Sequence, residues 1–265
     1  LHAHAVEIVF GWRAGFDDYA VFRQDADDPT SLASQIAGPF TSPVLTNGLG
    51  YWDGKIYAET KTGPMDKAVY EVNLDGSGFM TAQSVPTQVA YAFQGVALTL
   101  DGSAGYYVAV QQDRIVRQDL EAFEPIRETT ILETDDLYLA DIALDQRNGK
   151  IYWFAALSPT EDGVIQRANF DGTGLETLVD INDGLNPDYA PVNLELDVAR
   201  EKMYWSSIQG DIRRANLDGT NIEVVIPEVG FHGFALVIDP VPEPAAWLLA
   251  LGAGGALCCA RSRRR

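Results

Sequence analysis

The sequence is poor in cysteine and in positive charge. Its two cysteines, Cys258 and Cys259, lie in the apolar run near the C-terminus, so the remaining chain has no disulfide, thiol nucleophile or cysteine metal cluster. Acidic residues number 38 against 19 basic ones, which gives a formal net charge of −19. Such a surface repels nucleic acid, and we expect no DNA or RNA partner. The acidity serves either solubility or the attraction of cations and cationic polymers.

The sequence also lacks the signatures of common catalytic sites. It has three histidines, and no G-x-S-x-G elbow, H-E-x-x-H pair or glycine-rich phosphate loop. The acidic stretch at residues 25–28 has neither the glycine nor the closing glutamate of a calcium loop. The sequence therefore predicts a protein that is not an enzyme and holds no cofactor and no metal.

Long stretches of helical period are absent, and a repeat stands in their place. One phrase reads "VYEVNLDG", "IQRANFDG" and "IRRANLDG", with weaker copies "IVRQDLEA" and "YAVFRQDA". A strand-like phrase precedes all but the weakest copy, and its aligned tyrosines, spaced 50, 45 and 52 residues apart, are Tyr57, Tyr107, Tyr152 and Tyr204. A third, short apolar phrase ends in an aspartate each time, at Asp101, Asp145, Asp197 and Asp239.

Each repeat reads as four short strands joined by turns. Asp-Gly pairs favour tight turns, so the "NLDG" phrase predicts a hairpin turn rather than a catalytic site. Four antiparallel strands every 45 to 52 residues indicate a propeller blade, and the complete units span about 42–86, 90–134, 137–180 and 189–228. We expect a fifth blade to combine three N-terminal strands with the last strand, "FHGFALVID". The fold class is thus an all-β propeller, with five blades expected and six possible.

The repeat resembles the YWTD repeats, or class B repeats, of the low-density lipoprotein receptor family. Tyr152-Trp153 and Tyr204-Trp205 match the first half of that motif, whereas Phe154-Ala155 and Ser206-Ser207 replace its Thr-Asp. The resemblance covers residues 6–240 and is strongest in residues 141–227. It implies a propeller, usually of six blades. The departure from Thr-Asp leaves the contacts of those side chains open.

An aromatic residue precedes each expected innermost strand, where propeller loops enter the central channel. The predicted ligand site combines these aromatics with nearby polar residues, namely Tyr91, Gln94, Tyr138, Asp141, Tyr189, Asn193, Phe231 and His232. Flat side chains with polar groups between them suit carbohydrate or peptide capture. The alternative is that the aromatics pack between blades as part of the core.

The two ends of the chain read as targeting segments. Residues 1–5 fit the end of a signal peptide, because Ala3-His4-Ala5 has the small-x-small pattern of a cleavage site. Residues 241–265 hold Pro242-Glu243-Pro244, then 16 uncharged residues, then a basic cluster formed by Arg261, Arg263, Arg264 and Arg265. The apolar run predicts a helix of about 24 Å, which spans a bilayer only marginally. The arginines would remain on the cytoplasmic side.

This tail resembles the PEP-CTERM sorting signal of Gram-negative bacteria, and all three of its parts are present. The resemblance implies export to the cell envelope or the medium, with the tail helix anchored in the inner membrane until an exosortase-type protease processes it. It also implies a link to exopolysaccharide. A plain membrane anchor is the alternative reading of the same segment.

These observations favour an exported, non-enzymatic binding or scaffold module whose ligand is a protein or a carbohydrate. The competing hypothesis is a propeller enzyme of the metal-dependent lactonase or hydrolase kind. Asp141, Asn193 and Glu195 would then hold a metal at the channel mouth. A third reading is that the propeller is passive surface bulk.

Overall fold

The computed structural model describes the chain in segments, which are residues 6–13, 18–28, 30–41, 44–61, 67–86, 96–99, 102–109, 114–120, 127–134, 138–156, 163–181, 191–207, 211–227 and 231–238. These segments fold into five antiparallel sheets of four strands each. The predicted tail at residues 241–265, the predicted signal remnant at residues 1–5, and Asp101 and Asp239 lie outside them. No helix long and apolar enough to cross a membrane occurs within the described segments.

The sheets are the blades of the propeller, numbered along the chain. Blade 1 consists, from its inner to its outer strand, of β20 (Phe231–Ile238), β1 (Val6–Arg13), β2 (Asp18–Asp25) and β3 (Ser34–Thr41). Blade 2 consists of β4 (Val44–Trp52), β5 (Lys55–Lys61), β6 (Lys67–Asn73) and β7 (Met80–Thr81). Blade 3 consists of β8 (Val96–Leu98), β9 (Ala104–Ala109), β10 (Arg114–Asp119) and β11 (Arg127–Glu133).

Blades 4 and 5 carry the clearest repeats. Blade 4 consists of β12 (Tyr138–Asp145), β13 (Lys150–Ala156), β14 (Gly163–Asn169) and β15 (Glu176–Asp180). Blade 5 consists of β16 (Pro191–Asp197), β17 (Lys202–Ser207), β18 (Ile212–Asn216) and β19 (Glu223–Ile226). The prediction of five four-stranded blades is confirmed.

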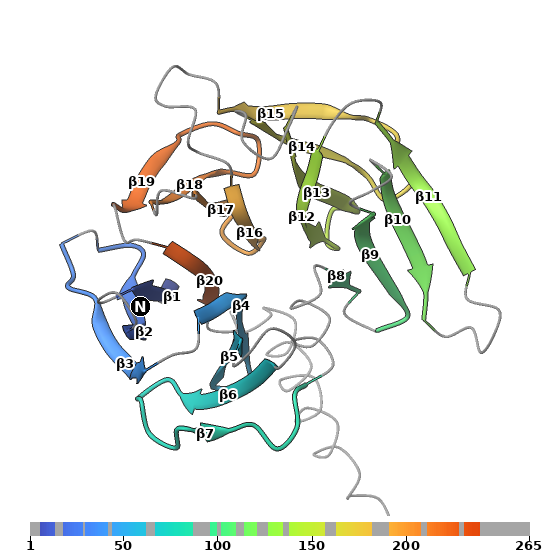
Figure 1. Cartoon of the computed structure of the whole chain (residues 1–265). Helices are drawn as coiled ribbons and strands as arrows, with labels where there is room; N and C mark the ends of the chain where they lie inside the picture. The colour runs from blue at the N-terminus through green and yellow to red at the C-terminus, as the bar shows by residue number, and fades with distance from the viewer. Residues whose placement is uncertain are drawn as a thin grey trace, which may run out of the picture. The chain divides into compact units, whose positions relative to one another are not determined.

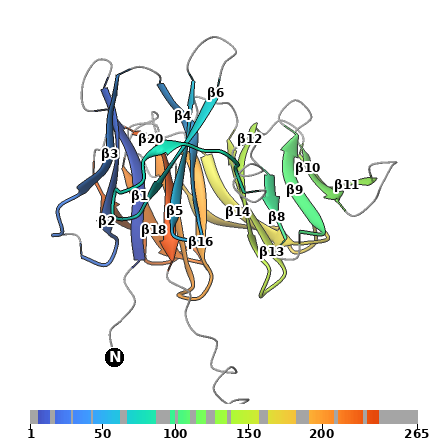
Figure 2. The same ribbon diagram turned by 90° about the horizontal axis from the view of Figure 1, so that it is seen from below.

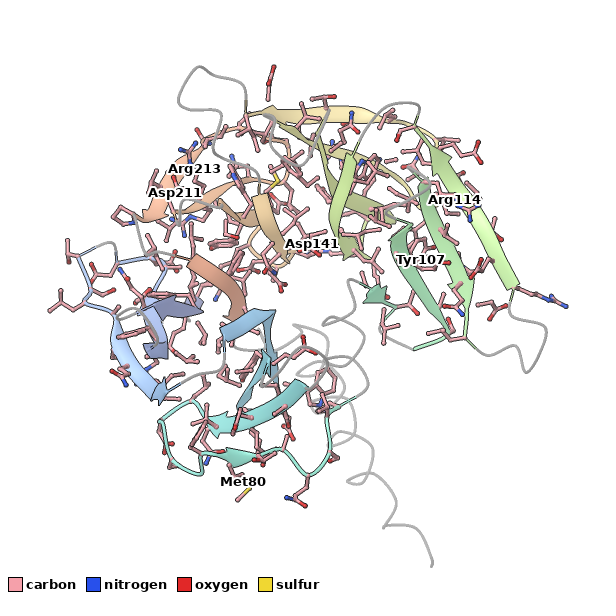
Figure 3. All side chains as sticks on the ribbon, viewed as in Figure 1. Met80, Tyr107, Arg114, Asp141, Asp211 and Arg213 are labelled. Carbon is pink, nitrogen blue, oxygen red and sulfur yellow. The ribbon has the colours of Figure 1, made fainter. Side chains whose placement is uncertain are left out.

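Within residues 5–238 the blades stand side by side around a common centre (Figures 1 and 2). The inner strands face that centre, and β20 contacts β4 of blade 2 on one side and β16 of blade 5 on the other. Strand β12 likewise contacts β16, and it contacts β8 and β9 of blade 3. Outer strands face solvent, and Met80 on β7 points away from the ring with half of its surface exposed (Figure 3).

Blade 1 is the predicted clasp between the two ends of the propeller. Strand β20 pairs with β1, and Val9 lies opposite Ala235 in this ladder. Alternation along β20 sends Phe234 toward blade 5 and Ala235 toward blade 2. The C-terminal strand is therefore buried on both faces, as its uninterrupted apolar sequence predicts.

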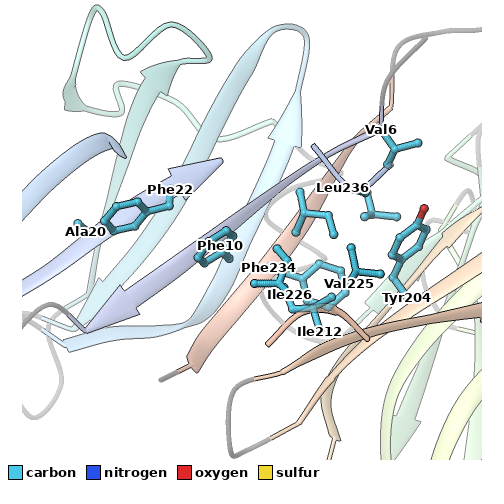
Figure 4. Packing of buried hydrophobic residues seen from close by; sticks show 12 residues of the cluster. Val6, Phe10, Ala20, Phe22, Tyr204, Ile212, Val225, Ile226, Phe234 and Leu236 are labelled. Atoms are coloured by element: carbon cyan, nitrogen blue, oxygen red, sulfur yellow. The ribbon is translucent and has the colours of Figure 1, made fainter. Parts of the chain in front are cut away.

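Apolar clusters fill the seams between neighbouring blades. The cluster between blades 5 and 1 contains Phe10, Tyr204 and Phe234, all fully buried (Figure 4). Comparable clusters lie between blades 1 and 2, between blades 3 and 4, and between blades 4 and 5. Each fully buried side chain of this size contributes about 1.5–3 kcal/mol of hydrophobic stabilisation, so the seams hold the ring together.

The two aromatics of the Tyr-Trp dipeptide pack into two different seams between blades. On β13, Tyr152 packs in the cluster toward blade 5, while Trp153 packs in the cluster toward blade 3. On β17, Tyr204 faces blade 1 and Trp205 faces blade 4. Because successive side chains of a strand point to opposite faces, one dipeptide supplies a large aromatic to each side of a blade.

The strand register corrects one alignment made from the sequence. In blades 2, 4 and 5, the residue two positions before the turn asparagine pairs with a tyrosine of the second strand. These tyrosines are Tyr57, Tyr152 and Tyr204. In blade 3 the residue opposite the equivalent Arg117 is Tyr106, not Tyr107. Tyr106 is buried, whereas the Tyr107 hydroxyl donates a hydrogen bond to Glu128 across the other face.

The "NLDG" phrase forms the hairpin turn between the third and fourth strands, as predicted. In blade 4 the Asp171 carboxylate accepts hydrogen bonds from the backbone N–H and the hydroxyl of Thr173, at 3.0 and 2.6 Å. Gly172 adopts a φ of 81°, and a Cβ built there would lie 2.1 Å from the carbonyl oxygen of Ile131 in blade 3. The glycine is therefore required both by the turn and by the close approach of the neighbouring blade.

The aspartate that ends an inner strand caps the turn that follows. Asp145 is buried, and its carboxylate accepts a hydrogen bond from the backbone N–H of Asn148 at 3.0 Å. Asp197 in blade 5 accepts the equivalent bond from the N–H of Arg200 at 3.1 Å. These recurring aspartates are structural, in agreement with their interpretation from the sequence.

Candidate functional site

The structure places part of the predicted ligand site on three adjacent inner strands. Asp141 lies within β12, Asn193 lies within β16, and β16 contacts both β12 and β20. The backbones of Tyr138, Phe231 and His232 begin β12 and β20. The remaining predicted members, Tyr91, Gln94 and Tyr189, lie outside the described residues.

Asp141 occupies an irregular position in its strand. The register between β12 and β13 shifts between Ala140 and Ile142, so Asp141 is the extra residue of a β-bulge. Bulges redirect side chains, and they recur at barrel rims and beside active sites. The Asp141 side chain lies near the centre of the ring (Figure 3).

The Asp141 carboxylate joins two blades. One oxygen accepts a hydrogen bond from the N–H of Ile142 at 2.9 Å, and the other accepts one from the N–H of Leu194 on β16 at 2.6 Å. The side chain is only partly exposed, and burial raises the pKa of Asp141 to about 6 despite these two bonds. Desolvation therefore outweighs hydrogen bonding at this carboxylate.

Glu195 is a second carboxylate on β16. It lies opposite Tyr204 in the ladder and therefore on the face of blade 5 that meets blade 1. Burial, with a further contribution from the charge of Asp141, raises the pKa of Glu195 to about 8. No hydrogen bond or ion pair to the Glu195 carboxylate is found in the described parts of the chain. Asp141 binds the N–H of Leu194, the residue before Glu195, so the two carboxylates belong to neighbouring inner strands.

Ser206 adds a hydroxyl to the same wall. It is opposite Asn193 in the β16–β17 ladder and has no exposed surface. Its Oγ atom has no hydrogen-bond partner among the described residues. A buried hydroxyl without a partner indicates a position that a water or ligand atom can satisfy. Sequence reasoning missed Ser206, because a serine in place of the motif threonine carried no distinctive signal.

The described residues of the site offer hydrogen-bond acceptors and do not form a metal centre. Within the described residues, no group of three or more His, Cys, Asp and Glu side chains could hold a metal ion. Asp141 and Glu195 instead offer two carboxylates that can receive hydroxyl, ammonium or guanidinium donors.

The five four-stranded sheets define the class of the protein as a five-bladed β-propeller. Comparison with family models and with curated proteins finds no match. Among solved structures, a chain of the nidogen/laminin complex is similar at 16% identity and a TM-score of 0.44, over 87% of this chain and 81% of that one.

Two bacterial structures show a similar likeness. TolB from Acinetobacter baumannii matches at 12% identity and a TM-score of 0.42, over 83% of this chain and 53% of TolB. The periplasmic gluconolactonase PpgL of Pseudomonas aeruginosa matches at 12% identity and a TM-score of 0.35, over 83% and 66% of the two chains. Likenesses at this level concern the fold alone.

Proposed function

We propose that this propeller is a non-enzymatic binding module whose ligand enters the central channel beside β12 and β16. The observation that carries the proposal is the position of Asp141, which a bulge in β12 displaces and which binds the N–H of Leu194, the residue before Glu195. Burial keeps Glu195 protonated up to about pH 8 in the free protein, and a ligand that brings a positive charge would favour its ionised form.

The ligand therefore carries an ammonium or guanidinium group, as basic protein segments and amino-polysaccharides do. The net charge of −19 draws such ligands toward the surface before they reach the channel. Asn193 and the Ser206 hydroxyl supply neutral hydrogen-bonding groups next to the carboxylates. Both a protein and a carbohydrate partner remain compatible with this chemistry.

Calorimetric titration tests the proposal with three probes: a glucosamine oligomer, a lysine oligomer and a neutral glucose oligomer. We expect at least one of the two cationic probes to bind and the neutral probe not to. Glu195→Gln and Asp141→Asn should each weaken binding by about tenfold, which corresponds to about 1.4 kcal/mol. Glu133→Gln removes the same charge from an exposed position on β11 and serves as the control. Equal losses in all three variants would show that only overall charge matters, and would overturn the channel site.

We further propose that the module is exported and sorted through its C-terminal tail. The support is the sequence alone: Pro242-Glu243-Pro244, an apolar run and an arginine cluster. Fractionation of cells that express the full chain tests this. Replacing the three residues of the Pro-Glu-Pro segment with alanine should leave the protein in the inner membrane. Release equal to that of the unaltered chain would rule out a sorting role for the segment.

A metal-dependent hydrolase is the second candidate, and the raised pKa values of Asp141 and Glu195 favour it. Perturbed carboxylates in a cavity are typical of general acids and bases. Purified protein should then bind calcium or zinc stoichiometrically, lose it in Asp141→Ala, and hydrolyse a lactone. Absence of both metal binding and hydrolysis would leave the binding module as the supported function.

A further inference from the structure

A second cavity lies away from the channel, between blades 4 and 5. It measures about 390 Å³ and opens beside the turns that join the first to the second strand and the third to the fourth strand. Its principal lining residues are Asp145, Asn148, Tyr152, Arg167, Lys202 and Leu217. Sites for small molecules commonly occupy about 300–1,000 Å³, so this volume fits a compact ligand.

The turns of blades 4 and 5 carry different residues at the position that faces the preceding blade. In blade 4 the turn position after the asparagine is Phe170, whose ring stacks on Tyr106 of blade 3 at 5.2 Å between centroids. In blade 5 the same position is Leu217, which lies beside Tyr152 of blade 4. Leucine is smaller than phenylalanine, and the guanidinium of Arg167 lies over the Tyr152 ring instead, 5.7 Å from its centroid.

The charges around the cavity are balanced, and its two arginines are already in ion pairs. Arg167 forms an ion pair with Glu176, and Arg200 forms one with Asp197 at 2.9 Å. The Lys202 ammonium donates a hydrogen bond to the side-chain oxygen of Asn216 at 2.6 Å. An anion would have to compete with these partners, and the balance of charges gives no net attraction to an ion of either sign.

The lining instead offers donors and acceptors close together. Lys202 has three N–H donors, and Asn216 takes one of them. Asp218 uses one carboxylate oxygen for the Thr220 backbone and hydroxyl, and its second oxygen remains an acceptor. Leu217 gives the cavity an apolar wall. Adjacent donors, acceptors and an apolar surface match a molecule with neighbouring hydroxyl groups and C–H faces, because each hydroxyl both donates and accepts.

We propose that this cavity binds a small, neutral polyhydroxyl ligand of the size of a mono- or disaccharide. The site is separate from the channel carboxylates, because it lies at the turns where the inner strands end, and neither Asp141 nor Glu195 lines it. It does not depend on the function proposed for the channel.

Calorimetric titration of the full chain tests the proposal with glucose, galactose, mannose, rhamnose, N-acetylglucosamine and maltose. At least one sugar should bind in the millimolar range or tighter. Inorganic phosphate and glycine serve as the ionic and zwitterionic probes, and neither should bind this cavity. Binding of only these two probes, or of none of the compounds, would overturn the proposal.

Leu217→Phe introduces the residue that blade 4 carries at the equivalent turn position, and should fill the cavity. We expect sugar affinity to fall by about tenfold or more, with the protein still folded by circular dichroism. Leu74→Phe makes the same change at the turn of blade 2 and should leave affinity unchanged. Glu195→Gln should also leave it unchanged, which separates this site from the channel. Sugar binding that survives Leu217→Phe would contradict the assignment.

Discussion

Desolvation determines the direction in which the pKa of individual carboxylates shifts in this protein. Asp141 accepts two backbone hydrogen bonds, which lower its pKa, yet burial still raises the pKa to about 6. Exposed turn acids show the opposite balance: the Thr173 hydroxyl and backbone N–H lower the pKa of Asp171 below its ordinary value. The two positions differ in water access rather than in hydrogen bonding, so the pKa is raised at Asp141 and lowered at the exposed turn acid.

The pKa of Glu195 predicts how stability depends on pH. The folded protein holds a proton on Glu195 up to about pH 8, whereas the unfolded chain loses it near the ordinary value of 4.5. The free energy of unfolding therefore falls as pH rises between these two values. Glu195→Gln imitates the protonated acid, so it should flatten this slope. At pH 8.5 it should be more stable than the unaltered protein by on the order of 2 kcal/mol. This is less than the full difference in pKa implies, because Glu195 is partly exposed.

Urea unfolding at pH 5 and pH 8.5 measures this effect. The two proteins should be nearly equal in stability at pH 5 and diverge at pH 8.5. Glu133→Gln, at an exposed position on β11, should follow the unaltered chain at both values. A slope that Glu195→Gln leaves intact would show that Glu195 ionises normally.

A turn glycine gives a second prediction at the residue scale. Gly172 and Gly149 both have positive φ, of 81° and 65°, but only Gly172 lies against a neighbouring blade. Gly149→Ala should cost about 1 kcal/mol of stability from backbone strain. Gly172→Ala adds a Cβ 2.1 Å from the Ile131 carbonyl oxygen, and should cost a further 1–3 kcal/mol or so.

Thermal or urea unfolding of the two glycine variants compares these costs directly. Because strain from positive φ is common to both, their difference reports the contact between blades 3 and 4. Equal destabilisation of the two variants would show that the turn of blade 4 is not in close contact with blade 3.

Residue-level expectations from the sequence held where a repeat constrained them. Asp171 was assigned to a turn because its phrase recurs, and the structure confirms it. The sequence grouped Asp141 with Glu195 as candidate metal ligands, but the bond from the Leu194 N–H to Asp141 could not be derived, because it depends on a bulge in β12 that has no sequence signature. The cavity beside Leu217 is likewise lined by turns of two blades, which come together only in the folded chain.

At the scale of elements, the clasp is the feature on which the propeller depends. Strand β20 is distant in sequence from β1, yet it pairs with β1 along almost its whole length. Its side chains join the clusters on both sides of blade 1. The sequence predicted this pairing, because the three strands left over at the N-terminus and the one at the C-terminus together make one blade.

Truncation of a clasp side chain should therefore destabilise the whole domain. Phe234 has no exposed surface and lies between blades 5 and 1 (Figure 4). Phe234→Ala should lower the free energy of unfolding by about 3–5 kcal/mol. Met80→Ala, at a half-exposed position on β7, should change it by less than about 0.5 kcal/mol. Chemical denaturation measures both, and a small loss for Phe234→Ala would mean that the clasp contributes little.

Element boundaries were predictable from the repeat, whereas exact register was not. The expected blades at 42–86 and 137–180 enclose the observed strands from Val44 to Thr81 and from Tyr138 to Asp180. The tyrosine of blade 3 was misaligned by one residue, because "AGYYV" contains two tyrosines in a row. A one-residue slip moves a side chain to the opposite face, and only the ladder resolves it.

At the scale of the molecule, net charge and the channel act at different stages of binding. If the proposed channel site is right, the overall charge of −19 should accelerate the approach of a cationic ligand, and Asp141 and Glu195 should slow its release. The association rate constant for the lysine oligomer should fall by about tenfold between roughly 0.02 and 0.2 M salt. Glu195→Gln should mainly raise the dissociation rate. Surface plasmon resonance separates the two rates, and an association rate insensitive to salt would rule out electrostatic steering.

Hydrogen exchange of the intact chain tests the central claim, that the two ends of the propeller interlock in blade 1. The account predicts that amides of β20 and β1 exchange slowly and with comparable protection, and that Phe234→Ala reduces the protection of both strands together. Rapid exchange throughout β20, with β1 to β3 still protected, would contradict it.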